Sequence, residues 1–369
     1  MNEAYLNTFN NTTSIVTNAG DVRAPNMTLS STAKILMYIC FIVIFLLGTV
    51  GNVIVIYAIG AKYRVVRGYN LHIISLSIAD LYTSIFLPVV TIHDLLTNLE
   101  AWHLGVIGCK ILPAMNHVTM LVSSFMLVII SVSRLRVIRS ARAIHISRKR
   151  CLIEISCAWI IAFFIVSPYM FVHKYNRQKE TCYDDWDTTD TRQDSIRRLI
   201  YFSVYECFAC FIPAIIMVVV YLQSISKLRS HHIPGNHACL ERNRKHKNMQ
   251  IIKMFGLIVF VFFTLTTPYM VSVFVVIYYM AYDKDFYTQH IELFFNLSYA
   301  LFILAGFNCC VNPFIYAGMH QDVRKFFQGL ATRKERHGTE LLKDSEVNRR
   351  SFTDFRTRCV SLQSSQEEN

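Results

Sequence analysis

Long apolar blocks separated by short polar stretches dominate this sequence. Seven of these blocks reach the roughly 20 residues that a helix needs to cross the hydrocarbon core of a bilayer. The blocks cover Ile35–Ala61, Leu71–Leu96, Val106–Val137, Cys151–Val172, Leu199–Ser226, Met249–Met280 and Ile291–Met319. The pattern therefore predicts an all-α membrane protein, with a seven-transmembrane helix bundle over residues 34–319.

The composition excludes several classes of protein. Apolar residues make up 53% of the 369 residues and charged residues only 17%, against about 25% charged residues in soluble domains. The formal net charge is +12, but the positive residues lie between the apolar blocks. A soluble enzyme, a disordered scaffold and a nucleic-acid-binding module are therefore excluded, and we expect no nucleic-acid partner.

The charges of the polar gaps predict the orientation in the membrane. The gaps after the first, third and fifth blocks are rich in Lys and Arg, so they face the cytoplasm and contact anionic lipid. The gap after the fourth block is acidic from Glu180 to Asp194 and faces outward. A multi-pass protein of the cell membrane follows, with an extracellular N-terminus and a cytoplasmic C-terminus. Glycosylation sequons at Asn10, Asn11 and Asn26 fit an extracellular N-terminal tail over residues 1–33.

The cysteines fit the same topology. Of the 11 cysteines, only Cys109 at the outer end of the third block and Cys182 in the acidic gap reach the oxidising side of the membrane. We therefore expect a disulfide between these two residues. The other cysteines are expected to pack in the bundle rather than to bind ligands.

Four of the polar side chains inside the apolar blocks stand out, because polar groups there are expensive and often mark function. They are Asn52, Asp80, Asn308 and Asn312. Each one alone is compatible with simple helix packing. All four are expected at one depth, so together they predict a single hydrated cluster.

Several motifs occur in register with these blocks. They are Gly51-Asn52, Leu76-Ser77-Ile78-Ala79-Asp80, Trp102-His103-Leu104-Gly105 followed by Cys109, Arg134, Trp159, Pro213 with Tyr221, Phe262 with Pro268, and Asn312-Pro313-x-x-Tyr316. In this order the sequence resembles the rhodopsin-like (class A) G-protein-coupled receptors over about residues 30–332. The resemblance implies a short amphipathic eighth helix parallel to the membrane over residues 320–331 and coupling to a heterotrimeric G protein.

The resemblance also implies two sets of site residues. An allosteric sodium ion would be bound by Asp80, Ser123, Asn308 and Asn312, and no other cofactor is expected. The alternative is a protonated Asp80 that bridges helices. Activation and G-protein coupling would depend on Arg134, Tyr221, Phe262, Pro268, Asn312, Pro313 and Tyr316, with an outward movement of the sixth helix about the Pro268 kink.

Two residues depart from the family pattern. Ser133 stands where most relatives have the aspartate that restrains the following arginine, and Thr266 replaces a tryptophan two residues before Pro268. Either basal activity is raised or other hydrogen bonds hold the resting state. A decoy or partner receptor that does not signal is a further alternative.

The expected ligand is a basic or amidated neuropeptide. Asn116 stands where amine receptors have aspartate, and Gly306 stands where opsins have lysine, so both of those ligand classes are disfavoured. The acidic outer loop would attract a cationic ligand, and Glu206 would pair with it unless it faces lipid headgroups. The pocket would consist of Asn116, His117, Met120, Glu206, Tyr269 and Phe302. A small non-peptide ligand remains the alternative.

The end of the chain is polar and without periodicity. We expect residues 332–369 to form a disordered cytoplasmic tail, phosphorylated by receptor kinases and bound by arrestin. We expect no enzymatic activity, since no HExxH motif occurs and Asp80, Glu154 and Glu206 lie on different helices at different depths.

Overall fold

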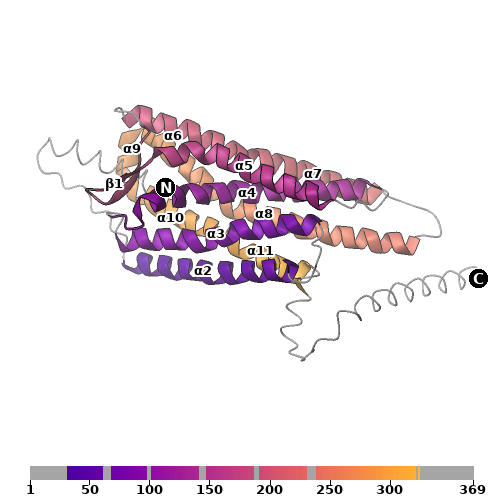
Figure 1. The fold of residues 1–369 in the computed structure, drawn as a ribbon. Helices are drawn as coiled ribbons and strands as arrows, with labels where there is room; N and C mark the ends of the chain where they lie inside the picture. The colour runs from indigo at the N-terminus through magenta and orange to yellow at the C-terminus, as the bar shows by residue number, and fades with distance from the viewer. Residues whose placement is uncertain are drawn as a thin grey trace, which may run out of the picture.

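The computed structural model describes residues 31–60, 68–97, 101–140, 147–186, 191–230, 238–320 and 323–324. Helices run side by side along most of this length (Figure 1). Those that form the bundle are α2 (Ser31–Gly60), α3 (Gly68–Leu96), α4 (Gly105–Arg139), α5 (Arg148–Val172), α6 (Thr191–Glu206), α7 (Ile212–Ser230), α8 (Ala238–Tyr282), α10 (Ile291–Gly306) and α11 (Asn308–Met319). The short α9 (Lys284–Gln289) connects α8 to α10.

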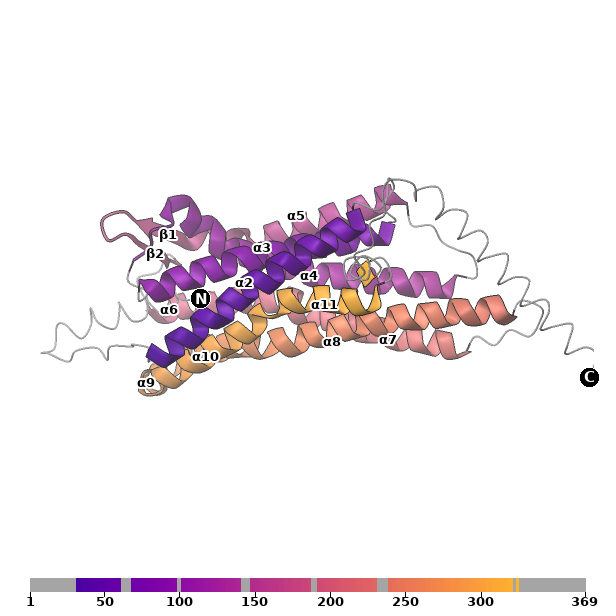
Figure 2. The same ribbon diagram turned by 90° about the horizontal axis from the view of Figure 1, so that it is seen from below.

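The predicted membrane bundle is confirmed. Seven stretches of the described helices are long and apolar enough to cross a membrane, and they coincide with the seven apolar blocks. Many large apolar side chains on the outer surface are exposed, among them Phe164 at 79% and Phe171 at 78%. This exposure is the expected surface of a protein whose solvent is lipid. The helix α8 begins at Ala238, well before the expected Met249, and extends beyond its neighbours at one end (Figure 2).

The motif Gly51-Asn52 brings α2 close to α11. A side chain at Gly51 would place its Cβ 2.9 Å from the ring of Pro313, so only glycine permits this approach. Next to it, the amide of Asn52 donates hydrogen bonds of 2.9 Å to the carbonyl oxygens of Gly48 and Cys309. Asn52 is therefore a packing residue that ties the first span to the last.

Two spans contain breaks that the apolar pattern did not predict. The fifth span consists of α6 and α7 joined by the π-helical segment η1 (Cys207–Phe211), and the seventh consists of α10 and α11 joined at Phe307. A π turn carries one extra residue and rotates the helix that precedes it relative to the helix that follows. Residues on the two sides of η1 therefore cannot be assigned to one face by counting with a period of 3.6.

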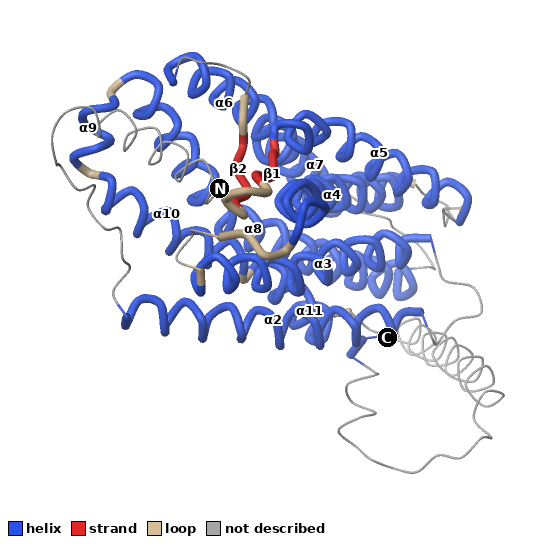
Figure 3. The backbone as a smooth tube through the Cα atoms, turned by 60° about the vertical axis from the view of Figure 1, so that its left-hand side comes forward, coloured by secondary structure: helices blue, strands red, loops and turns tan. Residues whose placement is uncertain are grey.

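The acidic outer loop folds into a hairpin that the all-α prediction did not include. The strands β1 (His173–Asn176) and β2 (Thr181–Asp184) pair antiparallel, and Figure 3 draws them in red at the end of the bundle that carries α6. The turn contains Glu180 with a φ of 49°, and its carbonyl oxygen accepts a hydrogen bond of 2.6 Å from the backbone N–H of Trp102. The predicted disulfide between Cys109 and Cys182 is confirmed and ties β2 to α4.

Some predictions fall outside the described residues. These are the sequons at Asn10, Asn11 and Asn26, the greater part of the eighth helix over residues 320–331, and the tail over residues 332–369.

Candidate functional site

A cavity of about 150 Å³ lies within the bundle between α3, α4, α8, α10 and α11. Its wall runs continuously from Trp102 and Asp94, at the hairpin end, to Asp80 and Asn308 deep in the bundle. Two sites that the sequence predicted separately, for the ligand and for sodium, therefore share one connected space.

Five of the six predicted ligand residues line this cavity. They are Asn116, His117, Met120, Tyr269 and Phe302. The sixth, Glu206, is buried with 4% exposure but is not among the described side chains that line the cavity. Glu206 ends α6 directly before η1, so the π turn gives it a different direction from the one obtained by counting back from Pro213.

The polar groups in the half of the cavity nearer the hairpin are suited to hydrogen bonding with a ligand. The side-chain oxygen of Asn116 is buried and has no hydrogen-bond partner among the described residues, so it can accept a hydrogen bond from a ligand. The ring of His117 packs against Tyr169 and Tyr205, with centroid distances of 4.8 and 5.0 Å. These contacts hold the imidazole in a fixed position at the wall.

Asp94 is a cavity residue that the sequence reasoning missed. It lies near the end of α3 with 7% exposure, and the His93 imidazole contacts its carboxylate at 3.2 Å. Its position at the very end of an apolar block, beside His93, was the available signal. The structure therefore places a carboxylate at the hairpin end of the cavity, on α3 rather than on the fifth span.

The deep end of the cavity is built around Asp80. The amide of Asn312 donates a hydrogen bond of 2.8 Å to one carboxylate oxygen, and the hydroxyl of Ser123 lies 3.5 Å from the other. Asn308 lines the same space. Three of the four predicted sodium ligands, Asp80, Ser123 and Asn308, therefore line the cavity. The fourth, Asn312, does not line it but is hydrogen-bonded to Asp80.

The opposite end of the bundle contains a second cavity of about 680 Å³, between α4, α7 and α8. Arg134 and Tyr221 both line it, and the guanidinium of Arg134 lies 5.6 Å from the centre of the Phe255 ring. Tyr221 fits closely against Gly256, since a Cβ there would come within 2.8 Å of its ring. Tyr316 is fully buried elsewhere, and its hydroxyl has no hydrogen-bond partner in the part of the chain that is described.

The helix α8 contributes residues to the walls of both cavities, and the residues of the predicted switch lie on it. Phe262 and Thr266 line the first cavity, two turns or less before Pro268 within the same helix. The Thr266 hydroxyl donates to the carbonyl oxygen of Phe262 at 2.6 Å, so the residue in the tryptophan position bonds to its own helix. Ser133 is buried with 4% exposure.

The acidic field of the outer loop is weaker than the sequence suggested. Arg198 lies 2.9 Å from Asp184 and donates from its Nε to Asp194 at 2.8 Å, while Lys174 pairs with Asp185 at 2.8 Å. Two cations thus neutralise part of the acidic set, in which Asp187 and Asp190 lie outside the described residues. The Arg198–Asp184 pair joins β2 to α6, whereas Arg198–Asp194 lies within α6 and Lys174–Asp185 lies within the loop.

The pKa of Asp184 reflects its contact with Arg198. Burial by itself raises the pKa of Asp184, but the neighbouring Arg198, His173 and the Trp186 indole together hold that pKa below its usual range. Because the folded-state pKa lies below the unfolded value of about 4, this stabilisation is present at neutral pH. It is lost as the pH falls through the folded-state pKa.

We expect Arg198→Ala to destabilise the outer loop by about 3–5 kcal/mol, since it leaves the carboxylate of Asp184 buried without its cation. Thermal unfolding of the purified protein measures the change. Lys174→Ala is the matched control, because the Lys174–Asp185 pair is exposed and contributes at most about 1 kcal/mol. Equal losses from the two variants would contradict this assignment.

The chain matches the family described as 7 transmembrane receptor (rhodopsin family) over residues 51–316. It therefore belongs to this family of G-protein-coupled receptors, as the sequence motifs predicted. The family and the seven spans make it a multi-pass membrane receptor with an extracellular ligand and a G-protein partner, rather than an enzyme.

The chain is also similar to individual receptors. Galanin receptor 2b of Danio rerio is 27% identical over 303 residues, which cover 80% of this chain and 75% of the relative. The G-protein coupled receptor homolog K2 of Swinepox virus is 26% identical over 332 residues, 87% of this chain and 83% of the relative. C-C chemokine receptor type 1 of Macaca fascicularis is 23% identical over 300 residues, 79% of this chain and 78% of the relative.

Proposed function

We propose that this receptor is activated by a basic or amidated peptide and signals through heterotrimeric G proteins. The observation that carries the proposal is the continuous cavity between the hairpin end and Asp80. The carboxylate of Asp94 lies at one end, and the wall contains the side-chain oxygen of Asn116, which has no partner among the described residues. A cationic or N–H-rich group matches both acceptors.

The size of the cavity supports a large ligand that inserts only one group. At about 150 Å³ it is smaller than the roughly 300–1,000 Å³ of pockets that enclose drug-sized ligands. A peptide would insert one side chain or its amidated end and rest the remainder on the hairpin. The same size also fits a very small non-peptide ligand, which is the second candidate.

Activation in this proposal follows the family's two-state movement. Phe262 faces the ligand cavity on α8, and the same helix carries Phe255 and Gly256 at the cavity of Arg134. A ligand that favours one position of Phe262 would bias the swing of α8 about Pro268 and open the Arg134 end for the G protein. In this orientation the N-terminus is extracellular, and the cytoplasmic tail is the substrate of receptor kinases and the partner of arrestin.

Screening basic, amidated peptides against the receptor in cells tests the ligand class. For an active peptide, we expect Asp94→Asn to lower its potency by about tenfold or more, because a charge-assisted contact contributes about 1.5–3 kcal/mol. A peptide whose basic residue is replaced should lose no further potency on this variant. Glu206→Gln is the matched control at a carboxylate outside the cavity. Potency that depends on Glu206 and not on Asp94 would overturn this binding mode.

We also propose that sodium binds at Asp80. A carboxylate with 3% exposure, bonded by the neutral groups of Asn312 and Ser123 and facing a cavity, is suited to a hard cation with water completing the shell. Sodium that prefers the resting state must weaken agonist binding, because the two equilibria are linked.

We expect agonist affinity to fall about tenfold when sodium chloride replaces the salt of a bulky organic cation, and to become insensitive to sodium in Asp80→Asn. Competition binding in membranes gives the ratio of the agonist affinities measured without and with sodium. Asp94→Asn, at the other end of the cavity, should keep the ratio even if affinity falls. A ratio that is the same in wild type and Asp80→Asn would show that Asp80 bridges helices as an uncharged group instead.

A further inference from the structure

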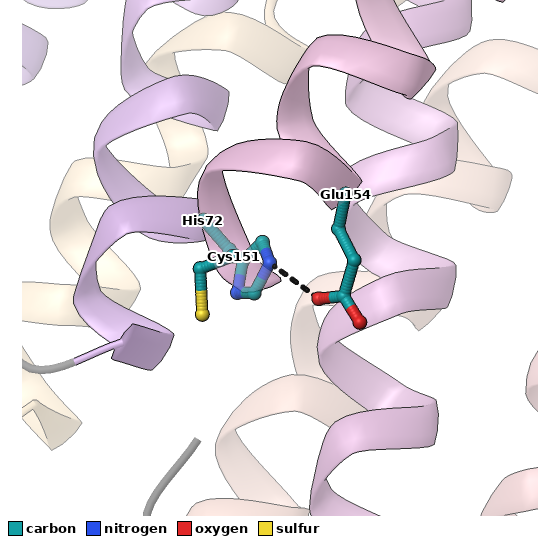
Figure 4. Close-up of side chains that lie close together, drawn as sticks. All are labelled: His72, Cys151 and Glu154. Carbon is teal, nitrogen blue, oxygen red and sulfur yellow. Dashed lines mark hydrogen bonds and ion pairs between the residues drawn. The ribbon is translucent and has the colours of Figure 1, made fainter. Parts of the chain in front are cut away.

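A second polar cluster, unconnected with either cavity, lies at the Arg134 end of the bundle. His72 comes from the beginning of α3, and Cys151 and Glu154 come from the first two turns of α5 (Figure 4). One ring nitrogen of His72, the sulfur of Cys151 and a carboxylate oxygen of Glu154 all lie within 4.8 Å of one another. His72 and Cys151 are fully buried.

The local sequence explains why these side chains meet. Cys151 and Glu154 are three residues apart, so they lie on one face of α5. That face packs against α3, and His72 enters between them, as Figure 4 shows with the imidazole between the sulfur and the carboxylate. The arrangement thus depends on two helices that are distant in sequence.

The imidazole is only half satisfied. Its Nε2 lies 3.1 Å from a carboxylate oxygen of Glu154, whereas its Nδ1 is buried and has no hydrogen-bond partner among the described residues. A buried polar atom without a partner is rare and costly. Nδ1 is therefore a donor atom that a metal ion can use. Glu154 binds the same ion only if its carboxylate turns from Nε2 toward that ion.

The chemistry of the three donors selects the kind of ion. Imidazole nitrogen, thiolate sulfur and carboxylate oxygen are the ligands of zinc, whereas magnesium and calcium require oxygen ligands. Donors around tetrahedral zinc lie roughly 3.4–3.8 Å apart, given metal–ligand distances of about 2.0–2.3 Å. The observed limit of 4.8 Å between the donor atoms exceeds that spacing by about 1 Å.

We propose that His72, Cys151 and Glu154 bind a zinc-class divalent transition metal ion, with water as the fourth ligand. Binding replaces the thiol proton of Cys151, which leaves to solvent, and the thiolate and carboxylate charges balance those of the ion. No electron transfer is involved.

The present partners of Glu154 link this site to the coupling end of the receptor. Arg150 and Arg136 lie 3.1 Å and 3.7 Å from Oε1 of Glu154, the oxygen that does not contact His72. Their side chains are 54% and 48% exposed, respectively. Both can turn toward water, since exposed ion pairs contribute little. A bound metal would thus join α3 to α5 and release Arg136, two residues beyond Arg134 on α4.

The test uses the full-length receptor, purified without agonist and freed of metal. Titration with zinc alone is followed by thermal unfolding, and titration with cobalt alone by the near-ultraviolet absorption of a cobalt–thiolate bond. We expect one ion per receptor at this site, a higher unfolding temperature with zinc, and a cobalt–thiolate band. No ligand or G protein enters the experiment, so its outcome is independent of the proposed peptide function.

Two variants and one control make the assignment. Cys151→Ser should abolish the cobalt–thiolate band, and His72→Gln should weaken zinc binding by more than the 10- to 100-fold typical of losing an outer partner of a ligand. Cys157→Ser removes an exposed thiol from the same helix and should change neither result. If Cys151→Ser does not fold, the zinc affinity of His72→Gln decides whether the ion binds at this cluster. Zinc stabilisation and a cobalt band that persist in these variants, or that are absent from the wild type, would show that the cluster is only a hydrogen-bonded contact between helices.

Discussion

Arg134→Ala is expected to abolish agonist-stimulated nucleotide exchange on the G protein while leaving agonist binding in place. Arg134 does not line the proposed ligand cavity but lines the second cavity with Tyr221, where the proposed mechanism brings it to the G protein. Loss of a charge-assisted contact of about 1.5–3 kcal/mol predicts a reduction of about tenfold to 100-fold, which leaves no peptide-stimulated exchange above the basal rate. Nucleotide exchange in membranes at matched receptor density measures it.

Ser133→Asp tests whether a carboxylate beside Arg134 stabilises the resting state. The serine supplies no carboxylate beside Arg134, so the added acid should stabilise the resting state and lower agonist-independent exchange by about tenfold. Ser133→Asn, which has a similar volume without charge, controls for the buried position. Basal exchange that is the same in the Asp and Asn variants would show that other contacts set the resting state.

Loss of the disulfide is expected to have the other large effect. Cys109 and Cys182 are separated by 73 residues, and the chain-entropy relation gives about 4 kcal/mol for a loop of this length. Helices that stay inserted shorten the effective loop, so we expect about 2–4 kcal/mol. Cys109→Ala should therefore lower surface expression and weaken ligand binding, because the hairpin would no longer be fixed to α4 beside Trp102, which lines the cavity.

The double variant separates the bridge from the side chains. Because either single substitution removes the same bond, Cys109→Ala, Cys182→Ala and the double variant should lose equal amounts of stability. Cys40→Ala, at a free cysteine in α2, is the control. Additive losses, or binding and trafficking like those of the wild type in Cys109→Ala, would contradict a structural bridge.

The spans and the disulfide could be predicted because they depend on properties that a sequence displays directly. Apolar length decides whether a helix crosses a membrane, and the seventh block, Ile291–Met319, has the same limits as the observed span. Cys109 and Cys182 followed from topology alone. The walls of the cavity were also largely predictable, since Asn116, His117 and Met120 occupy neighbouring positions on an uninterrupted helix.

Other features depend on tertiary contacts or on helix rotation. The hairpin strands have only four residues each and are held by the disulfide and by the Trp102–Glu180 hydrogen bond, so no local pattern marks them. The direction of Glu206 depends on the π turn after it. The cluster of His72, Cys151 and Glu154 joins residues that are about 80 positions apart, and the cysteine alone predicted only packing.

The most direct test of the account is nucleotide exchange by purified receptor reconstituted with a panel of purified heterotrimeric G proteins, with and without a basic, amidated peptide that binds it. The account predicts that the peptide accelerates exchange on at least one G protein in the wild type and on none in Arg134→Ala at equal peptide occupancy. A peptide that binds the wild type but accelerates exchange on no member of the panel would contradict the account and indicate a receptor that captures ligand without signalling.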